Sequence, residues 1–332
     1  EGLKLYVEHL CDRAPAHLEN IRLQQFGLSA EVKQFLDSKD KNILLIQGNI
    51  GSGKSLFLRK LEQDLWQEYQ NVKDRIPIHI SLFRYYDGKC VEALLQDNGF
   101  NEAMILELKK KNVVFLMDGY DEIAMINLFQ KNELGAWPNA KVIVTSRAQY
   151  LKGENYYSKF VNSNSGKKPT SFEEIFILPF NNDQIIKLIQ NHIKLISENN
   201  ELPLAHSRDT NWYIQKLRQF HFFQESFTDP LILKMLLDTL FVSSDADLLS
   251  KKTKFNIYTD FMKNWFLKQY IRNSSNKEAN EDYIINFLTT YAENFAFKLF
   301  LKGEQIADTE AIDWNPFFVN TDLNKHKDLV LG

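Results

Sequence analysis

The residues best placed to do chemistry in this chain form a glycine-rich run, residues 48–55, with the sequence GNIGSGKS. Glycines at this spacing let the backbone turn tightly, so that successive N–H groups point into one anion-binding hollow. The helix that should follow adds the positive end of its dipole. Lys54 can supply a mobile charge for β and γ phosphates, and the Ser55 hydroxyl can complete a Mg²⁺ shell. The run therefore predicts a polyphosphate site, with contacts from Gly48, Gly51, Ser52, Gly53, Lys54, Ser55 and Leu56.

A second group consists of carboxylates directly after the apolar run 113–117 (VVFLM). A carboxylate at the end of a buried strand needs a cation or a proton as a partner. We assign Asp118, with Ser55, to Mg²⁺, and Glu122 to activation of the attacking water, with Asp121 as the second choice. An acidic turn by itself is more often a solvated loop. Its pairing with the phosphate-binding run favours the catalytic interpretation.

Five short apolar runs indicate the elements that would hold these groups. They are residues 42–47 (NILLIQ), 76–82 (IPIHISL), 113–117 (VVFLM), 142–145 (VIVT) and 175–178 (IFIL). Nearly continuous apolar strands separated by helix-like segments are typical of a parallel sheet covered on both faces. The sequence thus predicts an α/β fold, a five-stranded parallel sheet with helices on both faces, ending near Pro179.

The remaining segments are predicted to be helical. Apolar residues at helical spacing indicate a short helix over 3–10 and another over 29–36, within an N-terminal helical linker, residues 1–38. After Pro179 strand signals become rare, and helices are expected over 183–196, 254–269 and 283–302. The aromatic stripes of the last two are interpreted as core packing.

Bulk properties exclude several classes of protein. A chain of 332 residues suggests two or three domains, and a net charge of -3 gives no reason to expect nucleic acid or an anionic membrane. Two distant cysteines support neither a disulfide framework nor a thiolate metal site. No apolar run reaches the length of a bilayer span, and we read no signal peptide in the sequence. We therefore expect a cytoplasmic protein, and the start at Glu1 suggests a piece of a longer chain.

The segment FLMDGYDEI, with an Asp-Glu pair after the first Asp and Gly, resembles the NACHT branch of the STAND ATPases. IPIHISL resembles that family's second strand, and VIVTSRAQY its fourth strand with the sensor 1 arginine, here Arg147. FILPFNNDQI is similar to the passage into its first helical domain. TDPLILKMLL resembles a helical-domain motif whose proline packs near the adenine, which implicates Pro230. YTDFMKNWF and YAENFAFKLF look like the start of its winged-helix domain.

The resemblance implies a division of the chain into domains. These are a P-loop nucleotide-binding domain over 39–180, a helical domain over 181–245 and a partial, winged-helix-like domain over 246–332. It also implies that Arg147 contacts the γ-phosphate and so distinguishes ATP from ADP by charge. The family's winged-helix histidine, which contacts the ADP β-phosphate, has no matching motif before Gly332, and His326 is not assigned to it.

The leading hypothesis is a signalling switch controlled by ATP and ADP, with slow Mg²⁺-dependent hydrolysis as the reset. ADP would hold the molecule closed, and ATP would favour a self-associating form, with other protein partners reached through regions outside this sequence. One alternative is a P-loop kinase for a small molecule, although no arginine-rich lid is evident. Another is a scaffold that binds nucleotide for stability without hydrolysing it. A guanine nucleotide is not expected, because the sequence contains no NKxD motif.

Overall fold

The computed structural model divides the chain into two compact units, Glu1–Leu237 and Asp238–Gly332. It describes residues 2–13, 25–70, 74–85, 89–123, 126–151, 155–161, 168–198, 209–218, 226–242, 254–273 and 281–302. The first unit contains the sheet and every predicted site residue.

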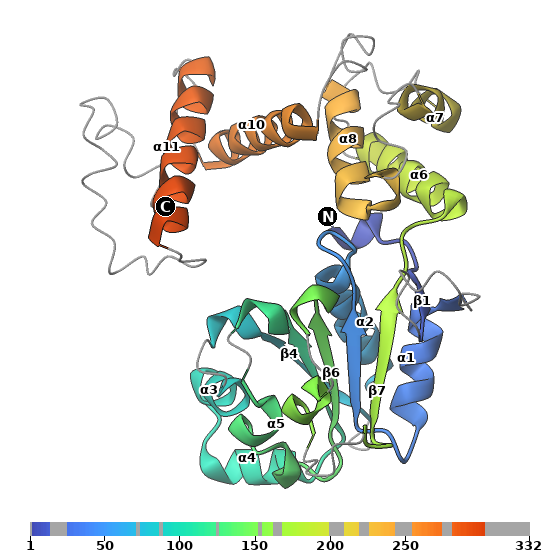
Figure 1. The fold of residues 1–332 in the computed structure, drawn as a ribbon, viewed down its shortest axis with the longest axis vertical. Helices are drawn as coiled ribbons and strands as arrows, with labels where there is room; N and C mark the ends of the chain where they lie inside the picture. Colours follow the sequence, from blue (N-terminus) through green and yellow to red (C-terminus); the bar gives the residue numbers. More distant parts are fainter. Residues whose placement is uncertain are drawn as a thin grey trace. The chain divides into compact units, whose positions relative to one another are not determined.

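The described strands form one mixed sheet with the order β2-β1-β7-β3-β6-β5-β4 (Figure 1). Its parallel core consists of β3 (Ile43–Gln47), β4 (Ile76–Ser81), β5 (Val113–Asp118), β6 (Lys141–Ser146) and β7 (Phe172–Ile177). Each of these strands overlaps one of the five apolar runs, although β7 begins three residues before the run 175–178. The predicted parallel core with helical flanks is therefore confirmed.

Two short strands widen the sheet and correct the N-terminal prediction. We expected a helix over 3–10, but only Gly2–Leu5 is helical, as a 3-10 turn, and β1 (Leu10–Asp12) is a strand. β1 pairs antiparallel with β7, and β2 (Phe26–Gly27) pairs antiparallel with β1. Backbone pairing across the sheet decides the conformation here, because the free edge of β7 offers hydrogen bonds that a short isolated helix cannot match.

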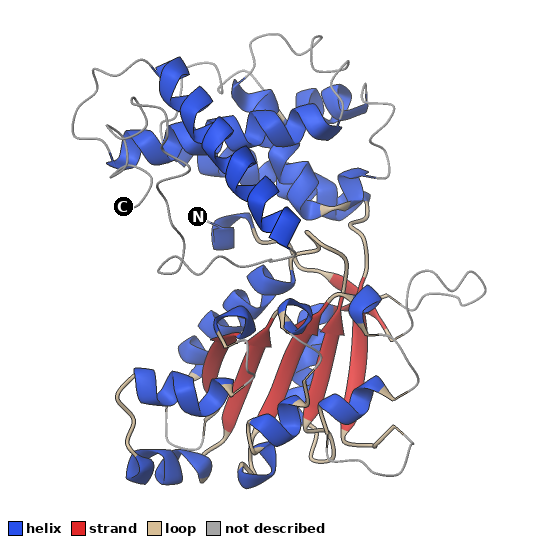
Figure 2. Cartoon of the chain, turned by 60° about the vertical axis from the view of Figure 1, so that its left-hand side comes forward, coloured by secondary structure: helices blue, strands red, loops and turns tan. Residues whose placement is uncertain are grey.

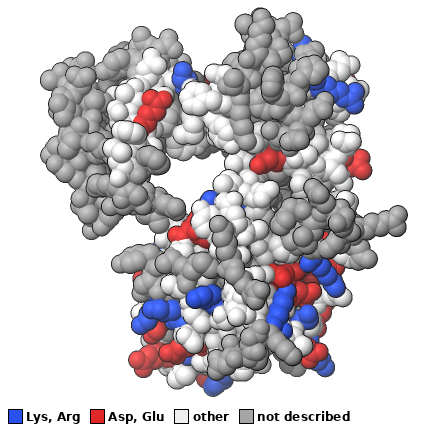
Figure 3. Space-filling model, viewed as in Figure 1, with Lys and Arg blue, Asp and Glu red and all other residues white. Residues whose placement is uncertain are grey.

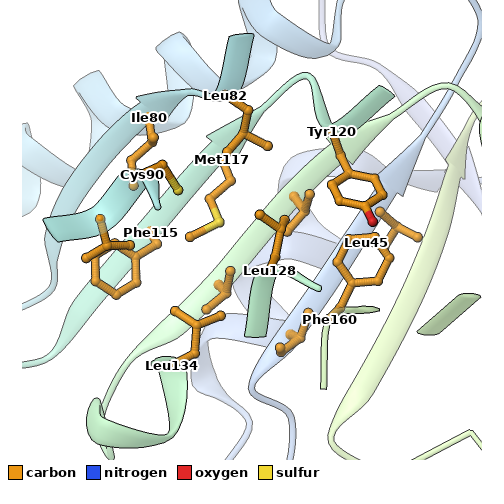
Figure 4. Packing of buried hydrophobic residues seen from close by; sticks show 14 of the residues in the cluster. Leu45, Ile80, Leu82, Cys90, Phe115, Met117, Tyr120, Leu128, Leu134 and Phe160 are labelled. Carbon is orange, nitrogen blue, oxygen red and sulfur yellow. The ribbon is translucent and has the colours of Figure 1, made fainter. Parts of the chain in front are cut away.

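Alternate residues of the parallel strands supply two separate apolar layers, as a period of two requires. One layer contains Leu45, Phe115 and Met117 and packs under the helices α3 (Cys90–Asp97), α4 (Glu102–Lys109) and α5 (Leu128–Lys131). Figure 4 shows part of this layer, and Figure 2 the helices beside the sheet. The other layer packs against α1 (Leu28–Asp37) and α2 (Lys54–Glu68). The sheet is thus covered on both faces, as predicted.

The helical region begins after β7. In the first unit it contains α6 (Asn182–Glu198), α7 (Thr210–Arg218) and the start of α8 (Pro230–Val242), whose first residue is the proline singled out in the sequence. α6 buries one apolar stripe, which includes Leu188 and Ile189. The predicted helices 29–36 and 183–196 are both present, within α1 and α6.

The second unit is described through two helices, α10 (Lys254–Asn273) and α11 (Glu281–Lys302). They agree with the helices expected over 254–269 and 283–302. The winged-helix-like domain stays a prediction, and His326 lies outside the described residues.

No helix in the described part of the chain is long and apolar enough to cross a membrane. On the face shown in Figure 3, acidic and basic side chains are intermingled over the sheet-bearing part, without a broad patch of one sign.

Candidate functional site

The phosphate-binding run forms a loop between the buried end of β3 and the first turn of α2. Gly51 and Gly53 have φ angles of 80° and 90°, a region that side-chain-bearing residues rarely adopt. The Lys54 Nζ donates to the carbonyl oxygens of Gly48 and Asn49, each at 2.8 Å. The lysine is therefore folded back over its own loop, and its ammonium group lies where the motif requires a charge for phosphate.

Close neighbours also require glycine at both positions. A Cβ atom at Gly51 would lie 2.5 Å from Oδ1 of Asp229, and one at Gly53 would lie 2.4 Å from Nε2 of His9. Both distances are shorter than any normal contact. The loop is therefore packed between the N-terminal segment and the residue that precedes α8.

Tyr120 anchors the acidic turn after β5 in the apolar core. This side chain is 1% exposed, packs on Phe160 with ring centroids 4.6 Å apart, and donates its hydroxyl to the carbonyl of Ile126 at 2.7 Å (Figure 4). Gly119 permits the turn with a φ of 84°. A buried aromatic anchor in the middle of the acidic run keeps the flanking carboxylates in fixed positions.

Asp118 is oriented by Thr145 at the end of the neighbouring strand β6. The Thr145 Oγ1 donates to Oδ1 of Asp118 at 2.6 Å and accepts from the Gly119 N–H at 2.9 Å. Thr145 is fully buried, so water does not compete for these two hydrogen bonds. Our sequence reasoning missed Thr145, although it lies two residues before the arginine that drew attention to VIVTSR.

The donor set fits Mg²⁺ bound together with a nucleotide. Among the described residues no group of three or more His, Cys, Asp or Glu could hold a metal ion alone. Mg²⁺ in nucleotide sites uses few protein ligands, and phosphate and water oxygens complete its shell. Asp118 and Ser55 line the same cavity, which is the carboxylate and hydroxyl pair that such a site needs.

Asp121 binds Arg147 at two points. Its Oδ1 accepts the Arg147 backbone N–H at 2.9 Å, and its Oδ2 lies 2.8 Å from the Arg147 Nε. The Asp121 side chain is 3% exposed and that of Arg147 is 28% exposed. The carboxylate that was the second choice for water activation is thus already engaged with a cation.

Glu122 lies beside it without such a partner. Its side chain forms no hydrogen bond or ion pair with another described residue, and burial, Asp121 and Asp118 together raise its pKa above the ordinary value. Burial lowers the pKa of Lys54, an effect that Asp121 opposes and Arg147 reinforces. Of the two acids, Glu122 is therefore the one whose carboxylate is available to take a proton.

These groups line one cavity of about 380 Å³, a size typical of small-molecule sites. Most predicted site residues take part in it: Gly51, Gly53, Lys54, Ser55, Leu56, Asp118, Asp121, Glu122, Arg147 and Pro230. Gly48 and Ser52 belong to the loop but do not line the cavity. Its other wall includes Leu5, Val7, Phe180 and Leu188, none of which our sequence reasoning assigned to the site.

His9 is a further lining residue that the sequence did not reveal. Its ring is 2% exposed, and neither nitrogen has a hydrogen-bond partner in the part of the chain that the structure describes. Burial lowers its pKa to about 4, an effect that Glu8 and the nearby backbone of Ser52 offset only in part. The ring is therefore neutral near pH 7. No local pattern around residue 9 signals this position, because the proximity arises from the pairing of β1 with β7.

A model of the NACHT domain family matches residues 42–196. No curated protein matches the chain. The five parallel strands, the phosphate-binding loop and the acidic turn described above lie in the matched range, whereas β1 and β2 precede it. This part of the chain is thus a P-loop NTPase domain.

Several solved structures are similar to the chain at low identity. The PCH-2 protein of C. elegans is 13% identical, with a TM-score of 0.39, over 67% of this chain and 61% of that one. A STAND protein with a tetratricopeptide repeat sensor from Pyrococcus horikoshii is 16% identical, with a TM-score of 0.37, over 78% of this chain and 36% of that one. A Walker-type ATPase of Pyrococcus abyssi is 14% identical, with a TM-score of 0.40, over 91% of this chain and 87% of that one. The chain therefore spans less than two thirds of the first two of these proteins.

Proposed function

Because residues 42–196 are a NACHT domain, we propose that this chain is the nucleotide-binding module of a signalling switch that binds and slowly hydrolyses ATP. The observation that carries the proposal is the convergence of four groups on one cavity. Lys54, Arg147 and the two acids Asp118 and Glu122 come from three separate segments and line the same space. Such an arrangement suits a γ-phosphate, its metal ion and an attacking water.

Each group has a role that its surroundings support. Lys54 and the loop amides bind the β and γ phosphates, and Arg147 adds a cation at the γ-phosphate. Asp118 and Ser55 would hold Mg²⁺, which when bound would supply positive charge to the phosphate oxygens. Glu122 accepts a proton from water while the water oxygen bonds to the γ-phosphorus and the bond to the β–γ bridging oxygen breaks. ADP and inorganic phosphate are the products.

The contact between the phosphate loop and the start of α8 supports the switch. Asp229 lies against Gly51. A conformational change in the phosphate loop would therefore displace the residue that precedes α8. Pro230, the first residue of α8, lines the cavity and is proposed to pack near the adenine. We propose that ADP stabilises a closed form, that ATP favours an open form that self-associates, and that hydrolysis resets the cycle.

The direct test is to denature purified protein and identify the released nucleotide by chromatography. We expect ADP from the wild type and little nucleotide from Lys54→Ala. Lys60→Ala is a matched control, because Lys60 lies on α2, pairs with Asp64 and does not line the cavity. ATP turnover should be slow and abolished in Glu122→Gln. Retention of nucleotide by Lys54→Ala, or transfer of phosphate to a small acceptor instead of water, would contradict the proposal.

A further inference from the structure

The pairing of Asp121 with Arg147 separates two carboxylates that are adjacent in sequence. Asp121 offers one oxygen to the backbone N–H and the other to Nε of the same arginine. Two contacts to one residue fix both the main chain and the side-chain direction of the arginine. Glu122, the next residue, makes no comparable contact among the described residues.

The contact leaves the outer end of the guanidinium group available. Arg147 uses Nε toward Asp121, and its two terminal nitrogens form no hydrogen bond or ion pair with another described residue. The guanidinium carbon lies 5.7 Å from the ring centroid of Tyr150, a cation–π distance. The group is thus held at its base and against a ring, while its fork of N–H donors remains unused. Such a fork is suited to two oxygens of one phosphate.

Burial makes this contact a persistent one. The Asp121 side chain is 3% exposed, so its charge is shielded from water and needs the cation beside it. The same carboxylate is the largest of the charges that favour protonated Lys54. Asp121 therefore pairs with Arg147 and its charge also acts on Lys54.

We propose that Asp121 is a positioning residue for Arg147, and that it sets the preference of the site for a triphosphate over a diphosphate. This inference rests on the proposed function, because it assumes that a nucleotide binds in the cavity. Asp121 orients the terminal nitrogens of Arg147 toward the position of a γ-phosphate and keeps the guanidinium from turning onto the carboxylate of Glu122. Water activation then belongs to Glu122 alone.

The test compares the dissociation constants of ADP and a non-hydrolysable ATP analogue on nucleotide-stripped protein, together with kcat. In Asp121→Asn, the side-chain NH₂ group would replace Oδ2 opposite the Nε–H of Arg147. Two hydrogen-bond donors would then face each other, and the attraction between the two side chains would be lost. We expect the dissociation constant of the ATP analogue to rise about tenfold relative to that of ADP, which is the size expected for one charge-assisted contact. Glu122→Gln should instead abolish turnover and leave the ratio unchanged.

Further variants distinguish positioning from a purely structural role. Arg147→Lys should shift the ratio as Asp121→Asn does, because one ammonium group cannot reach both the carboxylate and a phosphate with a planar fork. Adding Arg147→Ala to Asp121→Asn should shift the ratio no further than Arg147→Ala does alone. The matched control is Asp64→Asn, which removes a surface carboxylate on α2.

Several results would overturn the inference. One is a loss of kcat in Asp121→Asn equal to that of Glu122→Gln, with the nucleotide ratio unchanged, which would make Asp121 the base. Additive effects of the Asp121 and Arg147 variants would also contradict it. Failure of the wild type to bind either nucleotide would instead refute the proposed function, so the two failures can be told apart.

Discussion

Asp121 and Glu122, two adjacent acids in the turn after β5, have different environments. The sequence alone could rank them as candidates for water activation only by analogy with other P-loop enzymes. The Asp121 side chain is buried and paired with a cation, whereas Glu122 is exposed and its side chain is unpaired among the described residues. A carboxylate that lacks a cation and lies near two others holds its proton more strongly. The difference in surroundings is what allows one of them to act as a base and the other as a support.

The pH dependence of hydrolysis should report this difference. Because burial and the charges of Asp121 and Asp118 raise the pKa of Glu122, its carboxylate form is lost as pH falls through a value above that of an ordinary glutamate. We expect kcat to decline with falling pH along a limb displaced upward from the range of a solvated glutamate. The measurement is kcat against pH for the wild type, with Glu122→Gln as the variant whose residual rate lacks this limb.

The fold must be monitored in the same experiment. The folded state lowers the pKa of His9 to about 4, so it disfavours the protonated ring. The stability associated with neutral His9 is complete above the unfolded pKa, near 6.5, and is lost as pH falls toward 4. A fall in kcat that coincided with unfolding by circular dichroism would refute the assignment to Glu122.

At the scale of elements, the start of α8 has two functions. Asp229 accepts the Leu231 N–H at 2.9 Å and so caps the helix, and its carboxylate also lies against Gly51 of the phosphate loop. Its charge acts on Lys54 as well. A helix cap is thereby placed next to the site of a polyphosphate.

Asp229→Asn should strengthen nucleotide binding. The amide oxygen can still cap α8, while the removal of a negative charge beside the loop favours an anion by roughly 0.5–1 kcal/mol, or about twofold to fivefold in affinity. The gain should be larger for ATP than for ADP and should shrink at high salt. Isothermal titration at two salt concentrations measures it.

The matched control is Asp209→Asn. Asp209 caps α7 in the same way, through the Trp212 N–H at 2.8 Å, but does not line the cavity. An equal gain in both variants would show that the effect does not come from proximity to the loop.

Local patterns were sufficient for elements whose residues interact mainly with their neighbours in sequence. The run 42–47 and the glycine spacing after it identified β3 and the phosphate loop, and the acidic turn followed in the same way. The stretch 3–10 was wrong as a helix, because the pairing of β1 with β7 overrides apolar spacing. His9 and Thr145 were missed for a related reason, since each meets its site through contacts that are distant in sequence.

At the scale of the molecule, the proposed switch makes self-association depend on which nucleotide is bound. Glu122→Gln should bind ATP without hydrolysing it and thus accumulate in the ATP form. We expect it to form larger species than the wild type in ATP, and to remain small in ADP. Light scattering coupled to size exclusion measures this.

The Lys54→Ala variant should not form larger species with either nucleotide, because it lacks the ammonium group that binds the phosphates. Assemblies of equal size in ATP and ADP would contradict the switch, while leaving hydrolysis itself untouched.

Pro77 limits the ways in which such assemblies can be built. It lies in β4, which in the described part of the chain is an edge of the sheet, and proline has no N–H to offer to an incoming strand. Joining of two sheets through β4 would therefore lack a donor at this position. Contacts made at the β4 edge should accordingly involve side chains, which can separate and re-form as nucleotide turns over, in contrast to the persistent backbone ladders of fibrils.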